Sequence, residues 1–386
     1  MREPTQDPPQ FVAHPAGFVR LVERLSRQTQ IALDTEAASF HRYVDRVYLI
    51  QVTDDEGTAL VDPLAIDDLS PLGRILADPG IEIVLHDADY DLRILNRDYG
   101  FSARNVFDTR VAAQFAGEPA VGLGALLERY FSITIDKKLQ RADWSRRPLT
   151  SDMIDYAADD TRYLPALRDR LKAELELIGR LDWAREEFKL LEHLRWTQPV
   201  SDELAFTRIK GAKSLPPRSL AILRELHVWR ESTAKTLDRA PFRVLANSAL
   251  LTVARIAPRD VSRLKGIAGL PASAVERYGT AIVDAVIRGL GVPRKELPTI
   301  ERPTRREHDR EYDRRLERLK GLRNNRAKDI RMDPGMLCPN GTLQAIAHAA
   351  PKTEKQLARI RELREWQMKA LDVPTILSTL RGEDGG

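Results

Sequence analysis

No strand-like segment follows Pro199, and this boundary constrains the fold more than any other feature of the sequence. Before it, short apolar runs alternate with segments of helical spacing, and the D-D-E-G turn at 54–57 joins two of the runs as a hairpin. The predicted strands are residues 31–34, 47–52, 58–61, 81–85 and 105–107. An antiparallel start followed by alternating strands and helices is typical of a mixed sheet flanked by helices, so we expect an α/β domain.

Beyond this boundary only helical spacing remains. Pro216 and Pro217 precede an amphipathic helix, and the helices that follow have Gly or Pro at their ends. The Arg-rich stretch 305–333 has few apolar positions, and we expect a solvated helix there. The expected divisions are an α/β domain at 1–203, an all-helical domain at 204–291, a linker at 292–304 and a helical C-terminal region at 305–386.

The net charge of +4 hides an uneven distribution. Residues 1–203 carry a net charge of −11, whereas residues 204–386 carry +15, of which +9 falls on residues 204–291. An acidic region suits cation binding, and a basic region suits a polyanion. The charge distribution alone would be explained equally well by two ordinary solvated surfaces.

Cysteine usage and the N-terminus bear on the compartment. Cys338 is the single cysteine, which excludes an internal disulfide and a cysteine-based zinc site and fits a reducing environment. The opening residues, M-R-E-P-T-Q-D-P-P, lack the apolar core of a signal peptide, and no apolar run approaches membrane length. We therefore expect a soluble cytoplasmic protein, monomeric and without an obligate protein partner.

Two carboxylates, Asp34 and Glu36, come just past the short apolar run of the first predicted strand, in the stretch I-A-L-D-T-E. Side chains at i and i+2 of a strand share a face, so both carboxylates project into one small volume. Like charges held that close raise each other's pKa unless a cation lies between them. Such oxygen ligands favour Mg²⁺ or Mn²⁺, although the same pattern is common on solvated edge strands.

Further acids follow the strand at 81–85 and recur in a later helix. Three aspartates compete for a position beside the first strand: Asp87, Asp89 and Asp91. In the helix, Tyr156 and Asp160 share one face because they are four residues apart, whereas Asp155 and Asp159 share another. His86 fits a helix-cap or core residue better than a metal ligand.

These motifs resemble those of the DEDD superfamily of 3′→5′ exonucleases, in its tyrosine branch, and within it the ribonuclease D family. Three signatures agree in order and spacing: D-T-E, H-x-A-x-x-D and Tyr-x-x-x-Asp. Placed on them, the family's carboxylates and its tyrosine are Asp34, Glu36, Asp91, Asp160 and Tyr156; Asp87, Asp89, Asp155 and Asp159 fall off the pattern. The span 136–149 also resembles the segment between the second and third motifs. The resemblance implies a ribonuclease H-like fold for the α/β domain.

The resemblance further implies phosphodiester hydrolysis with two divalent metal ions, Mg²⁺ or Mn²⁺. In that arrangement Asp34 bridges the ions, Glu36 and Asp160 complete the site that binds the attacking water, and Asp91 holds the second ion through waters. An unperturbed phenol has a pKa near 10, so Tyr156 is a poor general base. We expect it to orient a water through a hydrogen bond.

The helical half carries a resemblance of its own. Residues 205–291 resemble a helicase-and-ribonuclease-D C-terminal (HRDC) domain, through K-G-x-K-x-L-x-P at 210–217 and G-L-P-x-x-x-V-x-R-Y-G at 269–279. Residues 305–380 are a candidate for a divergent second copy. We expect the basic HRDC-like region to raise affinity for RNA in a salt-dependent way.

Stacking and phosphate contacts are the general means of holding a single-stranded 3′ end. The candidate contacts are His41, Tyr43, Arg46, Lys137, Gln140 and Trp144. For His41 and Tyr43 a plain surface role fits as well, and for Trp144 a core role fits better.

The resemblance implies a metal-dependent exoribonuclease that trims 3′ ends of structured RNA, such as tRNA precursors, and releases nucleoside 5′-monophosphates. One alternative is a DNA exonuclease, since the same acids serve both kinds of substrate. The other is an inactive RNA-binding protein, which the retention of all five motif residues disfavours.

Overall fold

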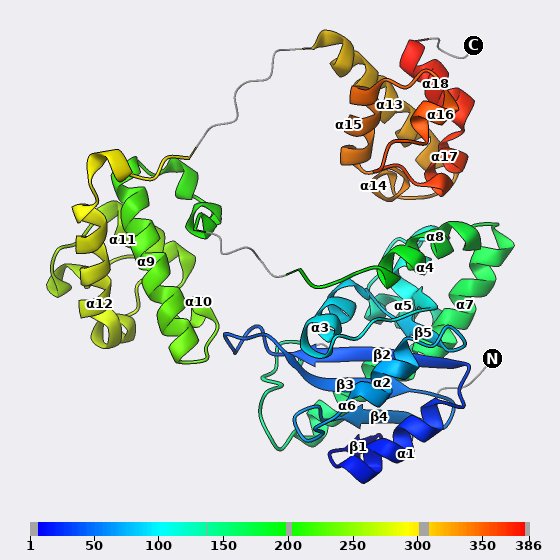
Figure 1. Cartoon of the computed structure of the whole chain (residues 1–386), viewed down its shortest axis with the longest axis horizontal. Helices are drawn as coiled ribbons and strands as arrows, with labels where there is room; N and C mark the ends of the chain where they lie inside the picture. The colour runs from blue at the N-terminus through cyan, green and yellow to red at the C-terminus, as the bar shows by residue number, and fades with distance from the viewer. Residues whose placement is uncertain (1–6, 137, 198–202, 301–308, 383–386) are drawn as a thin grey trace.

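A six-stranded mixed sheet with the order β1-β4-β3-β2-β5-β6 forms the centre of the N-terminal domain (Figure 1). The computed structural model describes residues 7–136, 138–197, 203–300 and 309–382. The strands are β1 (Gln10–Val12), β2 (Gln30–Ala37), β3 (Val47–Thr53), β4 (Thr58–Val61), β5 (Glu82–Leu85) and β6 (Val106–Asp108). Strands β2, β3 and β4 are antiparallel, as predicted, while β5 and β6 continue the sheet parallel to β2. The short strand β1, parallel to β4, was not predicted.

Strand β2 is buried on both faces of the sheet. Ile31 and Leu33 belong to the apolar core on one face, whereas Ala32 belongs to the core on the other. Helices cover both faces and are α1 (Pro15–Leu25), α2 (Ser70–Leu76), α3 (Asp89–Tyr99), α4 (Thr109–Ala116), α5 (Leu123–Phe131), α6 (Ser151–Arg162), α7 (Leu164–Leu177) and α8 (Leu181–Glu192). The sheet with its helical layers confirms the predicted α/β architecture.

The helical pattern at 150–177 is divided into two helices. Helix α6 ends at Arg162, and α7 begins at Leu164 with Pro165 in its first turn. Proline has no N–H to donate and restricts the residue before it, so it suits a helix start and interrupts a continuous helix. The break lets α6 lie across β2, β3 and β4 while α7 contacts β2 and β5.

The first helical domain begins near residue 203 and has an apolar core of its own. Its elements are η1 (Ala205–Arg208), η2 (Ala212–Ser214), α9 (Pro217–Thr236), α10 (Pro241–Val244), α11 (Asn247–Ile256), η3 (Val261–Leu264) and α12 (Ala272–Gly291), with η4 (Arg294–Glu296) after them. Helices α9 and α12 approach closely at Gly289, where an added Cβ would lie 2.5 Å from the Ile222 Cα. The predicted linker at 292–304 lies partly outside the described residues.

The second helical domain comprises α13 (Arg310–Asp329), α14 (Pro334–Leu337), α15 (Asn340–Ala349), α16 (Glu354–Leu357), α17 (Glu365–Leu371) and α18 (Val373–Arg381). The helix expected at 305–333 is present as α13, but within the described residues it is not solvated on all sides. Helix α13 buries Leu319 and Ala327 and packs against α15 and α18. A few apolar residues on one face are enough, because arginines of α13 also donate hydrogen bonds to backbone carbonyl oxygens of α15, α17 and α18.

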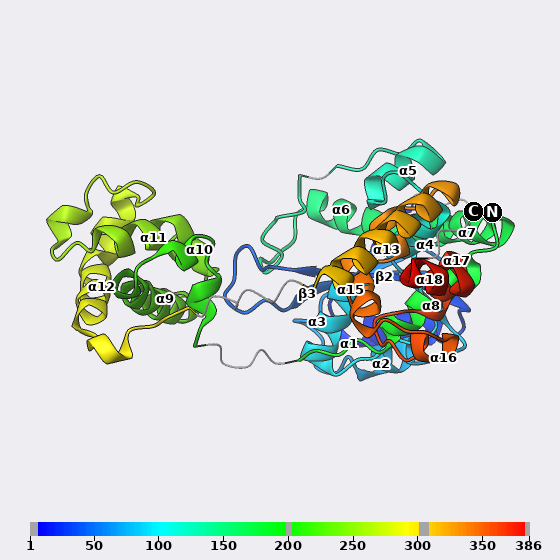
Figure 2. The same ribbon diagram turned by 90° about the horizontal axis from the view of Figure 1, so that it is seen from above.

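This second domain packs on α8 and the end of α4, a contact that we call the docking surface (Figures 1 and 2). Trp366 is 2% exposed, and its ring lies 4.8 Å from that of Phe115 and 5.7 Å from that of Trp183. Its indole N–H donates to Glu187 at 2.7 Å, and Glu186 accepts the first backbone N–H groups of α17 at 2.9 Å. One apolar core therefore runs from the N-terminal domain into the second helical domain.

The first helical domain meets the sheet domain through the loop that follows β2. Asp238 accepts the Tyr43 backbone N–H at 3.2 Å and pairs with Arg42 at 3.3 Å. Phe40 meets Phe242 edge to face, with ring centroids 6.3 Å apart. Both views show this loop reaching toward α10 (Figures 1 and 2). The contact is small and largely polar.

Among the described residues, no helix combines the length and apolar character needed to span a bilayer.

Candidate active site

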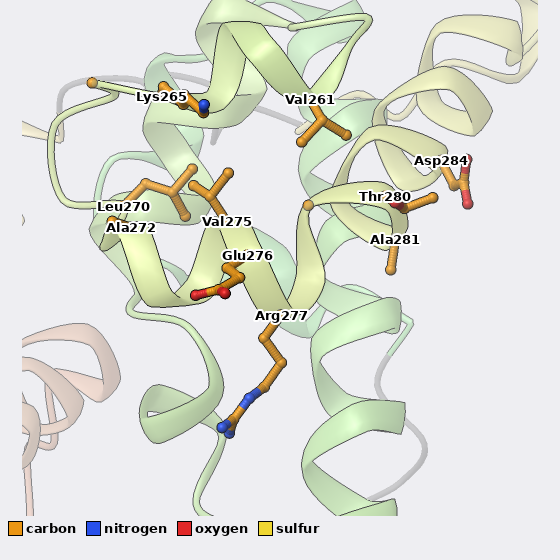
Figure 3. Close-up of a pocket in the computed structure, with 12 residues that line it drawn as sticks. Val261, Lys265, Leu270, Ala272, Val275, Glu276, Arg277, Thr280, Ala281 and Asp284 are labelled. Atoms are coloured by element: carbon orange, nitrogen blue, oxygen red, sulfur yellow. The ribbon is translucent and has the colours of Figure 1, made fainter.

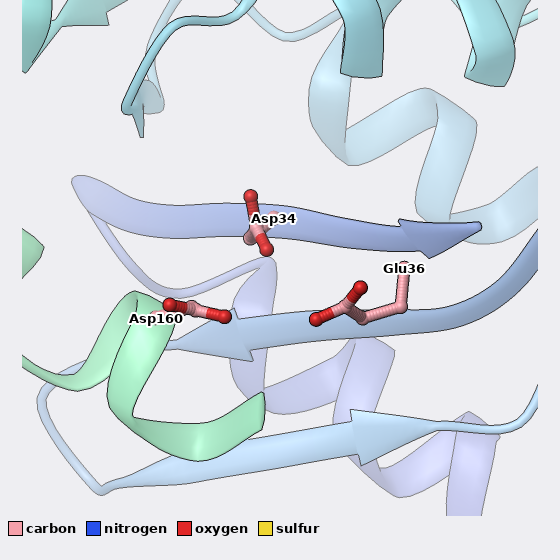
Figure 4. Close-up of side chains that lie close together, drawn as sticks. All are labelled: Asp34, Glu36 and Asp160. Atoms are coloured by element: carbon pink, nitrogen blue, oxygen red, sulfur yellow. The ribbon is translucent and has the colours of Figure 1, made fainter. Parts of the chain in front are cut away.

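Asp34, Glu36 and Asp160 converge above the sheet (Figure 4). One carboxylate oxygen from each lies within 4.8 Å of the others. Asp34 and Glu36 share a face of β2 because strand side chains alternate, and Asp160 reaches them from α6. The group therefore brings together Glu36 and Asp160, which are 124 positions apart in the sequence.

Packing and one hydrogen bond position α6 on the sheet. Met153 and Ala157 are buried against Leu49 and Leu60 of β3 and β4. At the end of the helix, the hydroxyls of Thr161 and Thr53 are hydrogen-bonded at 2.8 Å. Asp160 precedes this anchored residue directly, which holds its carboxylate over β2.

Asp91 is the aspartate of its segment that approaches the carboxylates. It is 6% exposed and accepts a hydrogen bond of 2.5 Å from the Thr35 hydroxyl. The turn before it depends on Asp108, whose buried carboxylate accepts the backbone N–H groups of Asp87 and Ala88. Sequence reasoning missed Asp108, although an aspartate that ends one strand and caps the next helix is a recognisable signal.

The charges of these groups are poorly compensated within the protein. Burial, followed by repulsion from Asp91, Asp160 and Glu36, raises the pKa of Asp34 well above its ordinary value. Burial also raises the pKa of Glu36, and it raises those of Asp91 and Asp160 to about 7. A cation bound among the carboxylates would favour their charged forms and reverse these shifts.

Tyr156 lies beside the carboxylates on α6. Burial and the neighbouring charges of Asp160, Glu36 and Asp34 raise its pKa above that of a free phenol, so it stays protonated at neutral pH. Trp144 packs behind it with a ring separation of 6.0 Å and is only 1% exposed. This burial agrees with the core role that the sequence favoured for Trp144 and leaves its ring no surface on which a base could stack.

A cleft of about 380 Å³ opens over the carboxylates. Its lining includes Gln140 and Tyr156, together with Arg110, which pairs with Asp87. Sequence reasoning missed Arg110 because no motif marks it. His86 also lines the cleft, but burial lowers its pKa to about 4, and it is hydrogen-bonded to the Thr109 hydroxyl at 2.9 Å.

Three of the remaining predicted substrate contacts, His41, Tyr43 and Arg46, are not among the residues that line this cleft. His41 contacts the Arg141 carbonyl oxygen at 2.9 Å, and Tyr43 is tied to Asp238 through its backbone. Arg46 is exposed, and Lys137 lies outside the described residues.

A larger cavity of about 800 Å³ lies in the first helical domain, between α12 and the segment that precedes it (Figure 3). Val261, Leu270 and Val275 give it an apolar lining, and the charged Lys265, Glu276, Arg277 and Asp284 are spread around it. The pKa shifts and the converging carboxylates both belong to the smaller cleft, which we therefore take as the candidate active site.

Comparison with known proteins places this geometry in a family. Residues 9–176 match the family model of 3′-5′ exonucleases, and residues 219–286 and 313–380 each match the HRDC domain. The chain is 32% identical to ribonuclease D of Desulfotalea psychrophila over 329 residues, covering 85% of this chain and 87% of that protein. The chain belongs to the ribonuclease D family.

Solved structures agree with this membership. RNase D of Escherichia coli, an exoribonuclease involved in structured RNA processing, superposes with a TM-score of 0.70 at 28% identity, over 97% of this chain and 99% of that one. A Bifidobacterium adolescentis protein superposes with a TM-score of 0.82 at 25% identity, over 99% of both chains. As a member of this family, the protein is a 3′→5′ exoribonuclease with helical HRDC domains, and its acidic cluster is consistent with metal binding.

Proposed function

We propose that this protein trims the 3′ ends of structured RNA such as tRNA precursors and releases nucleoside 5′-monophosphates by two-metal-ion hydrolysis. The observation that carries the proposal is the convergence of three carboxylates within 4.8 Å in the lining of a cleft of about 380 Å³. The E. coli relative acts in structured RNA processing, which supports the substrate class.

The residues present fit divalent ions. Oxygen-only ligands are those that Mg²⁺ and Mn²⁺ prefer, and the raised pKa values of the four acids mark a site lacking positive charge. Asp34, Glu36 and Asp160 would hold the ions directly, and Asp91 would hold one of them through waters. Bound there, two ions would supply an activated water and charge relief for the leaving 3′ oxygen.

The other site residues bind and orient. Protonated Tyr156 can donate a hydrogen bond to the attacking water, which fixes its direction of approach. Gln140 and Arg110 line the cleft and are placed to contact the nucleotide end. We further propose that residues 1–203 form the catalytic unit, that the basic residues 204–291 bind RNA, and that His41, Tyr43 and Arg46 contact the strand outside the cleft.

The test is digestion of a 5′-labelled single strand, as RNA and as DNA of equal sequence, with Mg²⁺, Mn²⁺ or EDTA. We expect a metal-dependent 3′ ladder on RNA and a much weaker one on DNA. Asp160→Asn should lower the rate by about a thousandfold, since metal-mediated charge stabilisation contributes several kcal/mol. The matched control is Asp159→Asn, which changes the adjacent aspartate that pairs with Arg162 instead.

Three results would contradict the proposal. Equal ladders on RNA and DNA would indicate a general exonuclease. A ladder that persists in EDTA would exclude the metal-ion mechanism. If Asp160→Asn and Asp159→Asn lowered the rate equally, the motif aspartate Asp160 would have no special role.

A tRNA precursor with a 3′ extension, digested beside the same RNA with its 3′ end base-paired, tests the substrate. Only the first RNA should be shortened.

A further inference from the structure

A second polar cavity, of about 560 Å³, lies where the exonuclease domain meets the first HRDC domain. We call it the junction cavity. Its charged lining consists of Arg42, Asp143 and Arg146 from the exonuclease domain and Asp238, Arg239 and Arg243 from the HRDC domain. Four guanidinium groups against two carboxylates leave the cavity with an excess of positive charge.

The two aspartates neutralise only part of this charge. Asp238 pairs with Arg42 at 3.3 Å, and Asp143 pairs with Arg146 at 3.3 Å. Arg146 remains 78% exposed, so its ion pair is weakened by solvent. Within the described part of the chain, the Arg239 side chain has no hydrogen-bond or ion-pair partner. Arg146 and Arg239 therefore present guanidinium groups to an anion, one from each domain.

The contact between the domains holds these groups in place. Arg243 donates from Nε to the Phe40 carbonyl oxygen, and the Ala240 backbone N–H donates to the His41 carbonyl oxygen at 3.2 Å. Both bonds fix the α9–α10 turn, which carries Arg239, against the loop after β2. A cavity built by two domains in this way is complete only when they are docked.

Two chain segments line both the active-site cleft and the junction cavity. The first runs from Glu36 in the cleft to His41 in the junction cavity, and the second runs from Gln140 in the cleft to Asp143. Separations of five and three residues correspond to at most about 17 and 11 Å of extended chain. The junction cavity is therefore next to the cleft along two independent paths.

We propose that the junction cavity binds the phosphodiester backbone of the RNA strand on the 5′ side of the nucleotide being removed. The inference rests on the proposed function, because it assumes that an RNA 3′ end occupies the cleft. With the 3′ end there, the preceding phosphates leave the cleft within reach of Arg146 and Arg239. Guanidinium groups recognise phosphate oxygens through paired N–H donors, and such contacts depend on neither base identity nor base pairing.

The test compares strands that do and do not reach the junction cavity. The variant is Arg146→Gln with Arg239→Gln, and the matched control is Arg104→Gln with Arg359→Gln, two exposed arginines that lie outside the cavity and outside residues 204–291. Binding of a fluorescein-labelled twelve-nucleotide RNA is measured in EDTA over a range of salt concentrations. The kcat/KM for that RNA and for a dinucleotide is measured with Mn²⁺.

We expect the variant to reduce the slope of log affinity against log salt by about 1.4, that is 0.7 for each lost phosphate contact, and to weaken binding about 25-fold at 0.1 M salt. The ratio of kcat/KM between the long strand and the dinucleotide should fall by a similar factor. The control should keep the wild-type slope and ratio.

Equal slopes for the variant and the control would overturn the proposal. A free nucleoside 5′-monophosphate offers the same phosphate chemistry as the RNA strand. If adenosine 5′-monophosphate inhibited dinucleotide hydrolysis by the wild type but not by the variant, and the slope for the long strand were unchanged, the cavity would bind that product instead. This result would also overturn the proposal. If the wild-type protein formed no ladder on RNA, the proposed function itself would fail, which is a different result from either.

Discussion

The docking surface and the acidic site both bury charged or polar side chains of the exonuclease domain, but they differ in compensation. At the docking surface Glu186 and Glu187 each accept N–H groups, and the Trp366 ring is enclosed by other aromatic rings. In the acidic site Asp34 and Asp160 repel each other, and their pKa values rise. The first arrangement adds to the stability of the fold, whereas the second lowers it until a cation is bound.

The two HRDC domains show the same contrast. The first touches the exonuclease domain through partly exposed polar groups, and the second shares an apolar core with it. Two stretches that match one family model therefore have different structural roles. The second belongs to the folded unit of the exonuclease, while the first presents a basic surface beside the cleft.

The largest effect on stability is expected at the docking surface. Trp366→Ala removes a ring packed against Phe115 and Trp183 and leaves Glu187 without its indole donor. We expect a loss of about 3 to 5 kcal/mol in the free energy of unfolding, as for other buried aromatic truncations. Chemical denaturation of the full chain measures it. A loss below about 1 kcal/mol, the range of ordinary surface substitutions, would refute the shared core.

A smaller effect, on turnover, is expected at the acidic site. Tyr156→Phe removes the hydroxyl but keeps the ring against Trp144, so packing and the carboxylates are preserved. Loss of a hydrogen bond that orients the water should lower kcat by about ten- to a hundredfold, corresponding to roughly 1.4 to 2.7 kcal/mol. Mn²⁺ affinity, measured by calorimetry, should stay within about twofold of the wild type. Weakened metal binding would instead make Tyr156 part of the metal site.

The smallest effect is expected where the first HRDC domain touches the loop after β2. Phe242 is 51% exposed and makes an edge contact with Phe40. Phe242→Ala should change the free energy of unfolding by only about 0.5 to 1 kcal/mol, in the range of exposed aromatic pairs. A loss as large as that of Trp366→Ala would mean that both HRDC domains are integral to the exonuclease fold, and the contrast between them would disappear.

Local periodicity predicted the parts of the site that lie on single elements. Alternation along β2 placed Asp34 beside Glu36, and helical spacing placed Tyr156 beside Asp160. Choosing Asp91 over its two neighbours required the family motif, since all three aspartates precede or begin the same helix. The three-residue strand β1 is too short to show a period, and its pairing with β4 depends on tertiary contacts.

Long-range packing was beyond the reach of the sequence. Trp366 and Phe115 are 251 residues apart, and neither lies in a pattern that points to the other. A core role fitted Trp144 better from the sequence, but only the fold shows that it packs with Met153 and Ala157 of α6. The break between α6 and α7 had a visible cause in Pro165, which the continuous helical spacing around it concealed.

The central claim, that the acidic cluster is a cation site, is tested most directly by thermal unfolding of the wild type, Asp160→Asn and Asp159→Asn, each in EDTA and in Mn²⁺ at pH 5.5 and 8. Burial raises the folded-state pKa of Asp160 to about 7, above its unfolded value of 3.8. The folded state therefore holds more protons between these values, and the contribution of this group to stability falls as the pH rises from about 4 to about 7.

In EDTA, the account predicts that the wild type loses more stability than Asp160→Asn between pH 5.5 and 8. At pH 8 without metal, the variant should unfold at the higher temperature, by about 2 to 4 °C for each kcal/mol of repulsion removed. Mn²⁺ should raise the midpoint of the wild type and of Asp159→Asn, and should leave Asp160→Asn nearly unchanged. Midpoints that do not respond to Mn²⁺ in any of the three proteins would contradict the claim.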